Sequence, residues 1–223
     1  MKNTRYLRIA LSLITTLLFL LGGTVLPVAA SDLAQKANIF LFPKPSAMAP
    51  LVLSTLSGEK VSLDEYRGRV VLLRFTSIEC PACKMEEPFL HQLKSKFGPA
   101  GLEILSVNLV DSPRAIAQYV QVNRFSYPVL HGGNGGFTFQ PVQLGERRTM
   151  FLVNPAKEAV LEVPGFPTTY VINCLGQAVA FSVGVGQWTD ASAEAFIGSL
   201  VSDRTACAAS KSAVPTPATV VRQ

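Results

Sequence analysis

The sequence predicts an α/β fold in which one central mixed β-sheet carries helices on both faces. Strand-like and helix-like segments alternate from residue 51 to residue 130, and an antiparallel strand pair with a closing helix follows within residues 168–201. With 223 residues, 48% of them apolar, the chain can bury one sizeable core but leaves little sequence for a second. We therefore expect one domain with appendages.

A secretory signal is expected in residues 1–30. Three basic residues and no acidic residue precede an apolar run over residues 9–30, and Val28 and Ala30 are small residues of the kind that a signal peptidase accepts. The same run is about long enough to span a bilayer, so an uncleaved N-terminal membrane anchor is the alternative. In both cases we expect a periplasmic or otherwise extracytoplasmic protein, and in the second case one anchored to the inner membrane.

Charge and cysteine content narrow the function classes. Of the 20 Lys and Arg, three would leave with a cleaved signal, so the rest barely exceed the 15 Asp and Glu. No basic excess remains for a nucleic-acid partner. Four cysteines in an exported chain would meet an oxidising compartment, where disulfides persist. Redox chemistry is therefore open to this protein.

The folded domain is expected over residues 50–203. Before it, residues 31–49 should form a linker with one short strand, because Pro43 and Pro45 exclude a continuous helix. After it, residues 204–223 should form a flexible polar tail.

Within the domain, each element has a local signal. The run Val70 to Leu73 is a buried strand, and Pro81 opens a helix that ends at Gly98-Pro99. The other expected strands are residues 51–53, 102–110, 127–130, 168–173 and 178–183, and the other helical segments are residues 62–66, 113–125 and 190–201.

An insert is expected at about residues 132–163. It begins with a glycine-rich stretch that is too flexible for regular structure. Residues 137–144 and 148–153 could then form a hairpin, in which Pro141 would confine its strand to an edge.

The motif that carries chemistry is Cys80-Pro81-Ala82-Cys83, placed after a buried strand and at a helix N-terminus. Free amides and the helix dipole stabilise a thiolate there, so Cys80 is the candidate nucleophile. Cys83 lies within reach of the same sulfur and can resolve a mixed disulfide with a substrate. Catalysis of this kind needs no bound cofactor.

Two other uses of the cysteines stay open at this point. A C-x-x-C pair is also half of a zinc site, or an inert structural bridge. No metal site is expected, because zinc would need two more ligands and only His91, His131 and two remote cysteines are present. The remote cysteines, Cys174 and Cys207, could form a structural disulfide that staples the C-terminal segment.

Two blocks, Ser62 to Leu90 and Gly165 to Gly176, resemble the TlpA/ResA-like branch of the thioredoxin superfamily. The resemblance implies a thioredoxin-like fold with an inserted segment before the strand that follows a cis-proline. Pro167, in Gly165-Phe166-Pro167-Thr168-Thr169, stands at the position of that proline. A proline offers no amide hydrogen, so Phe166, Pro167 and Thr168 would together present the neighbouring backbone to a substrate strand.

The resemblance also implies a direction and partners. Such proteins usually act as reductants that receive electrons from a membrane thiol carrier and reduce cysteines of extracytoplasmic proteins, as in cytochrome c maturation. The alternatives are a metallochaperone or assembly factor that binds Cu(I) through the same thiols, and an interaction scaffold that docks a partner on the insert.

Three charged residues are candidates for redox tuning. Glu86 matches an acidic residue that the family places near its active site, where it would handle protons, although carboxylates are also favoured in the first turns of any helix. Glu79, directly beside Cys80, should disfavour a thiolate, while Arg74 and Lys84 should favour one. Arg74 stands where thioredoxin carries a buried acid, and we expect it to extend outward or to pair with Glu79.

Overall fold

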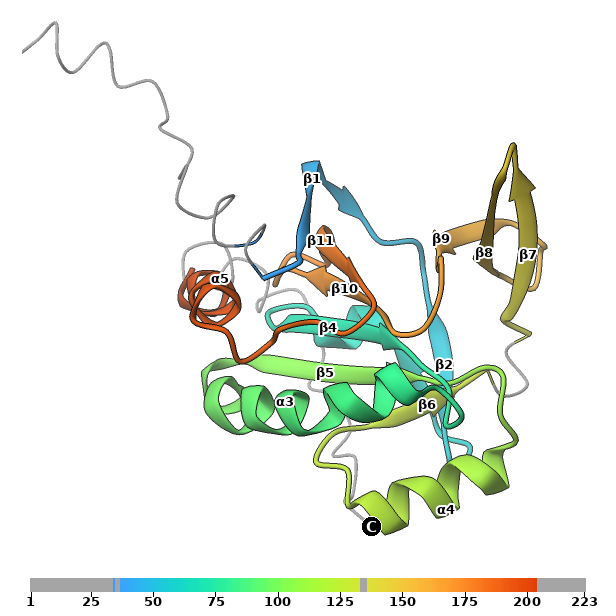
Figure 1. Ribbon diagram of the computed structural model, residues 1–223, viewed down its shortest axis with the longest axis horizontal. Coiled ribbons are helices and arrows are strands. Elements are labelled where there is room, and N and C mark those ends of the chain that lie inside the picture. Colours follow the sequence, from blue (N-terminus) through green and yellow to red (C-terminus); the bar gives the residue numbers. More distant parts are fainter. Residues whose placement is uncertain (1–33, 35–36, 133–135, 204–223) are drawn as a thin grey trace, which may run out of the picture. The chain divides into compact units, whose positions relative to one another are not determined.

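The computed structural model describes residue 34, residues 37–132 and residues 136–203 (Figure 1). The chain divides into two units at Asp32, and all the described residues belong to the second. Within these ranges, no helix has the length and apolar character needed to cross a membrane. The expected signal or anchor, the C-terminal tail and Cys207 lie outside the described residues.

The core of the fold is an eight-stranded mixed sheet, in the order β1-β11-β10-β4-β5-β6-β2-β3. Its central strands β4, β5 and β6 are parallel, and the neighbours on both sides pair antiparallel. The strands are β1 (Phe40–Ala47), β2 (Val52–Thr55), β3 (Lys60–Ser62), β4 (Val70–Phe75), β5 (Leu102–Val107), β6 (Val129–His131), β10 (Thr168–Ile172) and β11 (Gln177–Val183). The predicted α/β class with a mixed central sheet is therefore confirmed.

The α-helices that accompany the sheet within residues 37–132 and 136–203 are α3 (Pro81–Phe97), α4 (Pro113–Asn123) and α5 (Ala191–Ser202). Each begins at a capping side chain, which belongs to Cys80, Ser112 and Asp190 respectively. Pro81 and Pro113 occupy the first positions of their helices, where a missing amide hydrogen costs no hydrogen bond.

The two faces of the sheet carry separate cores. On one face, α3 and α5 pack on the apolar side chains of β4, β5 and β10. On the other face, the covering elements are the 3-10 helix η1 (Leu63–Tyr66) and the insert. We expected helices on both faces of the sheet. In the described part of the chain, the only helical element in the core of this second face is the short η1. A second 3-10 helix, η2 (Gly98–Ala100), ends α3.

The segment before residue 50 is more than the expected linker. Residues 40–47 form β1, which pairs antiparallel with β11 at the sheet edge, and Ile39 is buried in the core. Pro43 and Pro45 fall where the pairing is irregular, a place where the missing amide hydrogens are tolerated. The prolines exclude a helix here but permit the expected strand, which lies at an edge of the sheet.

The insert is a small sheet of three antiparallel strands, β7 (Thr138–Leu144), β8 (Arg147–Val153) and β9 (Ala159–Glu162). The expected hairpin is present as β7 and β8, and Pro141 lies on the edge strand β7. The short β9 was not expected. Phe137, Leu152 and Val163 are buried and anchor the insert to the main sheet.

Candidate active site

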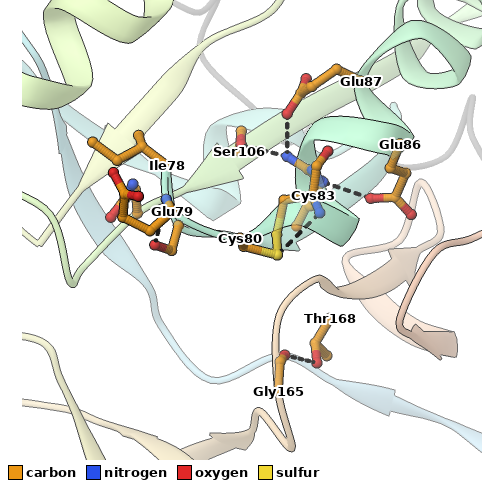
Figure 2. Close-up of a disulfide and its surroundings, with 12 residues drawn as sticks. Ile78, Glu79, Cys80, Cys83, Glu86, Glu87, Ser106, Gly165 and Thr168 are labelled. Atoms are coloured by element: carbon orange, nitrogen blue, oxygen red, sulfur yellow. Dashed lines mark hydrogen bonds and ion pairs between the residues drawn. A yellow bond between two sulfur atoms is a disulfide. The ribbon is translucent and has the colours of Figure 1, made fainter.

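Cys80 and Cys83 form a disulfide at the first turn of α3 (Figure 2). Cys80 is the N-cap residue, and the amide of Cys83 donates a hydrogen bond to Cys80 Sγ over 3.0 Å. Cys83 is 1% exposed, whereas Cys80 is only half-buried. A substrate can therefore approach Cys80, while Cys83 is within reach of Cys80 alone.

The loop before β10 lies beside the strand that leads to the cysteines. Thr168 at the start of β10 pairs with Phe75 at the end of β4, five residues before Cys80. The Phe166–Pro167 peptide bond is cis, and Thr168 Oγ1 donates a hydrogen bond to the carbonyl of Gly165 over 2.6 Å. In the view of Figure 2, Gly165 and Thr168 are on the side of the helix that carries the disulfide.

A buried ion-pair network lies behind the disulfide and centres on Arg74 of β4. The Arg74 side chain is fully buried and donates from Nε to Glu86 over 2.8 Å and from Nη1 to Glu87 over 2.9 Å. Its Nη2 donates to the carbonyl of Cys83 over 2.9 Å. Figure 2 shows Glu86 and Glu87 on the turns of α3 that follow Cys83.

The two carboxylates are in turn held by distant segments. Glu86 Oε1 accepts from the backbone amide of Gly186 over 2.8 Å and from Trp188 Nε1 over 2.6 Å. Glu87 Oε2 accepts from the hydroxyl of Tyr127. One cation thus links the redox helix to β4, and its partners link the same helix to the segments before β6 and before α5.

Burial and neighbouring charges shift the pKa values of Arg74 and Tyr127 in this network. Burial alone would lower the pKa of Arg74, but Glu87 and Glu86 outweigh it and raise that pKa, so the guanidinium stays charged. Burial, and next Glu87, raise the pKa of Tyr127 far above its ordinary value. Tyr127 therefore remains a neutral donor to Glu87.

Arg74 also belongs to a polar row that crosses the sheet. Ser106, Arg74, Thr169 and Ser182 are directly opposite one another on four neighbouring strands, and all are buried. Ser106 Oγ accepts from Arg74 Nη1 over 3.4 Å. Among the described residues, Thr169 Oγ1 and Ser182 Oγ have no hydrogen-bond partner.

The expected position of Arg74 is wrong. It neither extends into solvent nor pairs with Glu79, because two carboxylates of α3, which packs on the same face of the sheet, contact it directly. Glu79 is exposed, and its backbone amide donates to Ser77 Oγ. The residue expected to handle protons, Glu86, is fully buried and uses both carboxylate oxygens in hydrogen bonds.

Several residues of the site carry no signal in the sequence. Glu87 meets Arg74 only after the chain has folded, across a separation of 13 residues. In the same way, Tyr127 meets Glu87 across 40 residues, and Trp188 meets Glu86 across 102 residues. A buried arginine followed by two consecutive glutamates on a helix is the pattern that could have indicated an ion pair.

A second group of unexpected residues positions the approach to Cys80. The amide of Ile78 donates to Asp111 Oδ2 over 2.9 Å, and Asn108 Nδ2 donates to the same oxygen over 2.7 Å. The segment after β5 therefore holds the loop that precedes the disulfide.

The remaining candidates lie apart from the disulfide. Cys174 is buried after β10, and its expected partner Cys207 is outside the described residues, so that bridge stays a prediction. His91 Nδ1 shares a hydrogen bond with Ser126 Oγ over 2.7 Å. In the ranges that the structure describes, no three His, Cys, Asp or Glu side chains are grouped so as to hold a metal ion.

Comparison with known proteins gives consistent results. A model of the AhpC/TSA family matches residues 44–162, more than half of the chain. The chain is 27% identical over 173 residues to the thiol-disulfide oxidoreductase ResA of Bacillus subtilis, which covers 78% of this chain and 93% of that protein. ResA of Bacillus thuringiensis is 27% identical over 119 residues, which covers 52% of this chain and 67% of that protein. The resemblance to the TlpA/ResA-like branch is confirmed.

Solved structures share the fold. A putative thiol:disulfide interchange protein DsbE from Chlorobium tepidum superposes with a TM-score of 0.54 at 20% identity, over 72% of this chain and 99% of that chain. A secreted thiol-disulfide isomerase from Corynebacterium glutamicum gives a TM-score of 0.55 at 16% identity, over 72% and 92%. The thioredoxin-like fold is thereby confirmed.

Proposed function

The chain belongs to the AhpC/TSA family and is a thiol-disulfide oxidoreductase, and we propose that it acts outside the cytoplasm as a reductant of protein disulfides. The observation that carries the proposal is the Cys80–Cys83 disulfide at the N-terminus of α3, with one accessible and one buried cysteine.

The reaction follows from this asymmetry. The thiolate of Cys80 attacks one sulfur of a substrate disulfide, forms a bond to it and releases the other substrate sulfur as a thiolate. Cys83 then attacks Cys80 Sγ, which forms the Cys80–Cys83 disulfide and releases the second substrate thiolate. Two electrons pass from the pair to the substrate, and the two thiol protons of the pair end on the substrate thiols by way of solvent.

The groups around the two sulfurs favour different roles for them. Cys80 caps α3 and accepts a hydrogen bond from the amide of Cys83, which stabilises negative charge on the attacking sulfur. Behind Cys83, one guanidinium faces the carboxylates Glu86 and Glu87. Such a network brings no net positive charge to a thiolate of Cys83.

The direction of transfer rests on the same charges. Strong oxidants of this superfamily owe their high potential to a stabilised reduced form. Here the acids outnumber the cation behind the pair, and Glu79 adds an exposed carboxylate in front of it. We therefore expect the thiolate form to be stabilised less than in a strong oxidant, and so a reductant.

A polypeptide is the substrate that suits the loop before β10. Phe166, Pro167 and Thr168 place backbone beside the end of β4, where an extended substrate strand can pair while its cysteine meets Cys80. Curated relatives are named thiol-disulfide oxidoreductases. The signal-like residues 1–30 support an extracytoplasmic location, and that location requires a membrane thiol donor to reduce the pair again. Maturation of cytochrome c is a process that needs such a reductant.

Reduction of insulin by dithiothreitol tests the activity. We expect the wild-type protein to accelerate precipitation of the insulin B chain, and Cys80→Ser to abolish the acceleration because the attacking sulfur is lost. Glu146→Gln, at the exposed tip of the insert, is the matched control and should equal the wild type. Equal rates with wild type and Cys80→Ser would refute the proposal.

A further inference from the structure

We infer that Arg74 is a positioning residue for the second step of the exchange, in which Cys83 releases the substrate from Cys80. The inference rests on the proposed dithiol-disulfide exchange and goes beyond it, because it assigns one step of that exchange to a buried cation. The reacting sulfurs remain those of Cys80 and Cys83.

Among the residues that the structure describes, the ionic contacts of Arg74 are with one short segment of α3. Its three described acceptors on α3 are the carbonyl of Cys83 and the carboxylates of Glu86 and Glu87, at 2.8 to 2.9 Å. These acceptors lie within residues 83–87. A single side chain of β4 therefore ties the first turns of the redox helix to the sheet.

The tied segment ends at Pro88, inside α3. A proline has no amide hydrogen for the carbonyl four residues earlier, here that of Lys84, and its ring disfavours a straight helix. The turns before Pro88 are thus joined to the rest of α3 by fewer hydrogen bonds than a regular helix would provide. The guanidinium of Arg74 supplies an attachment from outside the helix at the same place.

No smaller cation can make the same set of contacts. The guanidinium is a rigid planar fork, and it uses three different nitrogens on three acceptors. A lysine carries its donors on one nitrogen. It could neutralise one carboxylate without holding the Cys83 carbonyl.

The second step depends on this attachment more than the first. Cys80 is half-buried at the helix cap, and none of the described hydrogen bonds of Arg74 goes to it. Cys83 is 1% exposed, so its sulfur reaches Cys80 only from the position that its own backbone fixes. Misplacement of a reacting atom by about 1 Å can slow a reaction by about a hundredfold.

A quenched time course separates the two steps. Reduced protein is mixed with insulin, samples are quenched with acid, free thiols are alkylated, and the mixed disulfide and the Cys80–Cys83 disulfide are quantified by mass. The wild type should not accumulate the mixed disulfide, and Cys83→Ser should trap it. In Arg74→Gln we expect attack within about threefold of the wild type and resolution at least about tenfold slower, so that the mixed disulfide accumulates transiently.

Lys94→Gln is the matched control. Lys94 lies on the same helix beyond Pro88, and it also forms an ion pair, with Glu103 over 2.9 Å. Its removal should leave both steps unchanged. If Arg74→Gln fails to fold, as judged by the fluorescence of Trp188, then Arg74→Lys carries the test, with resolution slowed at least about threefold more than attack.

Two results would overturn the role of Arg74: both steps slowed by the same factor, which a merely structural residue would cause, or neither step slowed. If Cys83→Ser traps no mixed disulfide, the proposed exchange itself is wrong, and the role of Arg74 is wrong with it. Failure of the proposed exchange can be told apart from failure of the role of Arg74, because the exchange is tested in Cys83→Ser, a variant that retains Arg74.

Discussion

A fully buried guanidinium is accommodated in this protein because two carboxylates and a backbone carbonyl accept its hydrogen bonds. Removing one partner of a buried ion pair typically costs about 3–5 kcal/mol, since the remaining charge stays uncompensated. Here Arg74 faces two carboxylates, and each carboxylate has a further donor in Trp188 or Tyr127. The cluster therefore behaves as one unit, in which the loss of any member leaves a buried partner without one of its ionic or hydrogen-bond contacts.

Because of Tyr127, the free energy of unfolding should change with pH in the alkaline range. Burial and Glu87 raise its folded pKa above the ordinary value of about 10. The neutral phenol is thus favoured by folding, its contribution is complete below about pH 10, and it is lost as the pH rises further. We expect the free energy of unfolding of the wild type to fall above that pH. In Tyr127→Phe it should fall less steeply, and the two slopes should differ by up to about 1.4 kcal/mol per pH unit.

Urea titrations at pH 8 to 11 measure this effect, with the fluorescence of Trp188, the one tryptophan in the chain, as the probe. At neutral pH, Tyr127→Phe should lose about 1–3 kcal/mol, because Glu87 loses a buried donor. Identical pH slopes for the two proteins would show that Tyr127 ionises as freely in the folded state as in the unfolded one.

The sequence indicates the chemistry of single residues but not their partners. Cys80, Pro81 and Cys83 could be assigned together because a helix start, a nucleophile and a resolving thiol are encoded within four residues. Arg74 could not be assigned, because its counter-charges come from the next helix and Trp188 lies 102 residues after Glu86.

At the scale of elements, the insert and the loop before β10 are joined by aromatic side chains. Phe139 of β7 packs edge-on against Phe75, with 6.0 Å between the ring centroids, and its ring is tilted against that of Phe166 at 5.5 Å. The hydroxyl of Tyr170 donates to the carbonyl of Glu162 over 2.6 Å and fixes β9 to β10. The insert is thus attached at the residue expected to present backbone to a substrate.

Phe139→Ala should therefore impair polypeptide substrates selectively. Aromatic pairs contribute about 0.5–1.5 kcal/mol beyond their burial, so we expect kcat/KM for insulin to fall about threefold to tenfold, while reduction of a small aromatic disulfide stays unchanged. Leu144→Ala, at an exposed position of the same strand, should change neither rate. Equal losses with both substrates would assign Phe139 to general packing.

Elements with local signals were predictable, and those that depend on pairing were not. α3, β4 and the strands after the cis-proline follow from helical spacing, a continuous apolar run and turn residues. The membership of β1 in the sheet depends on pairing with β11, far along the chain, and β9 is a four-residue strand that forms its backbone pairing with β8. Neither partner could be identified from the segment itself.

At the scale of the whole domain, strand order assembles the site. Because β10 lies directly beside β4, the loop before β10 reaches the end of the strand that leads to Cys80. The same order aligns Arg74 with Ser106, Thr169 and Ser182 across four strands. A disulfide that is open to a substrate on one side and supported by buried charges on the other follows from this arrangement.

The reduction potential of the Cys80–Cys83 couple tests the proposed direction of transfer most directly. It is measured by equilibration with defined ratios of reduced and oxidised dithiothreitol or glutathione, followed by alkylation of the free thiols. We expect about −250 mV or a more negative value, close to the roughly −270 mV of the reductant thioredoxin. A value above about −180 mV, in the range of disulfide isomerases and oxidants, would contradict the assignment of this protein as a reductant.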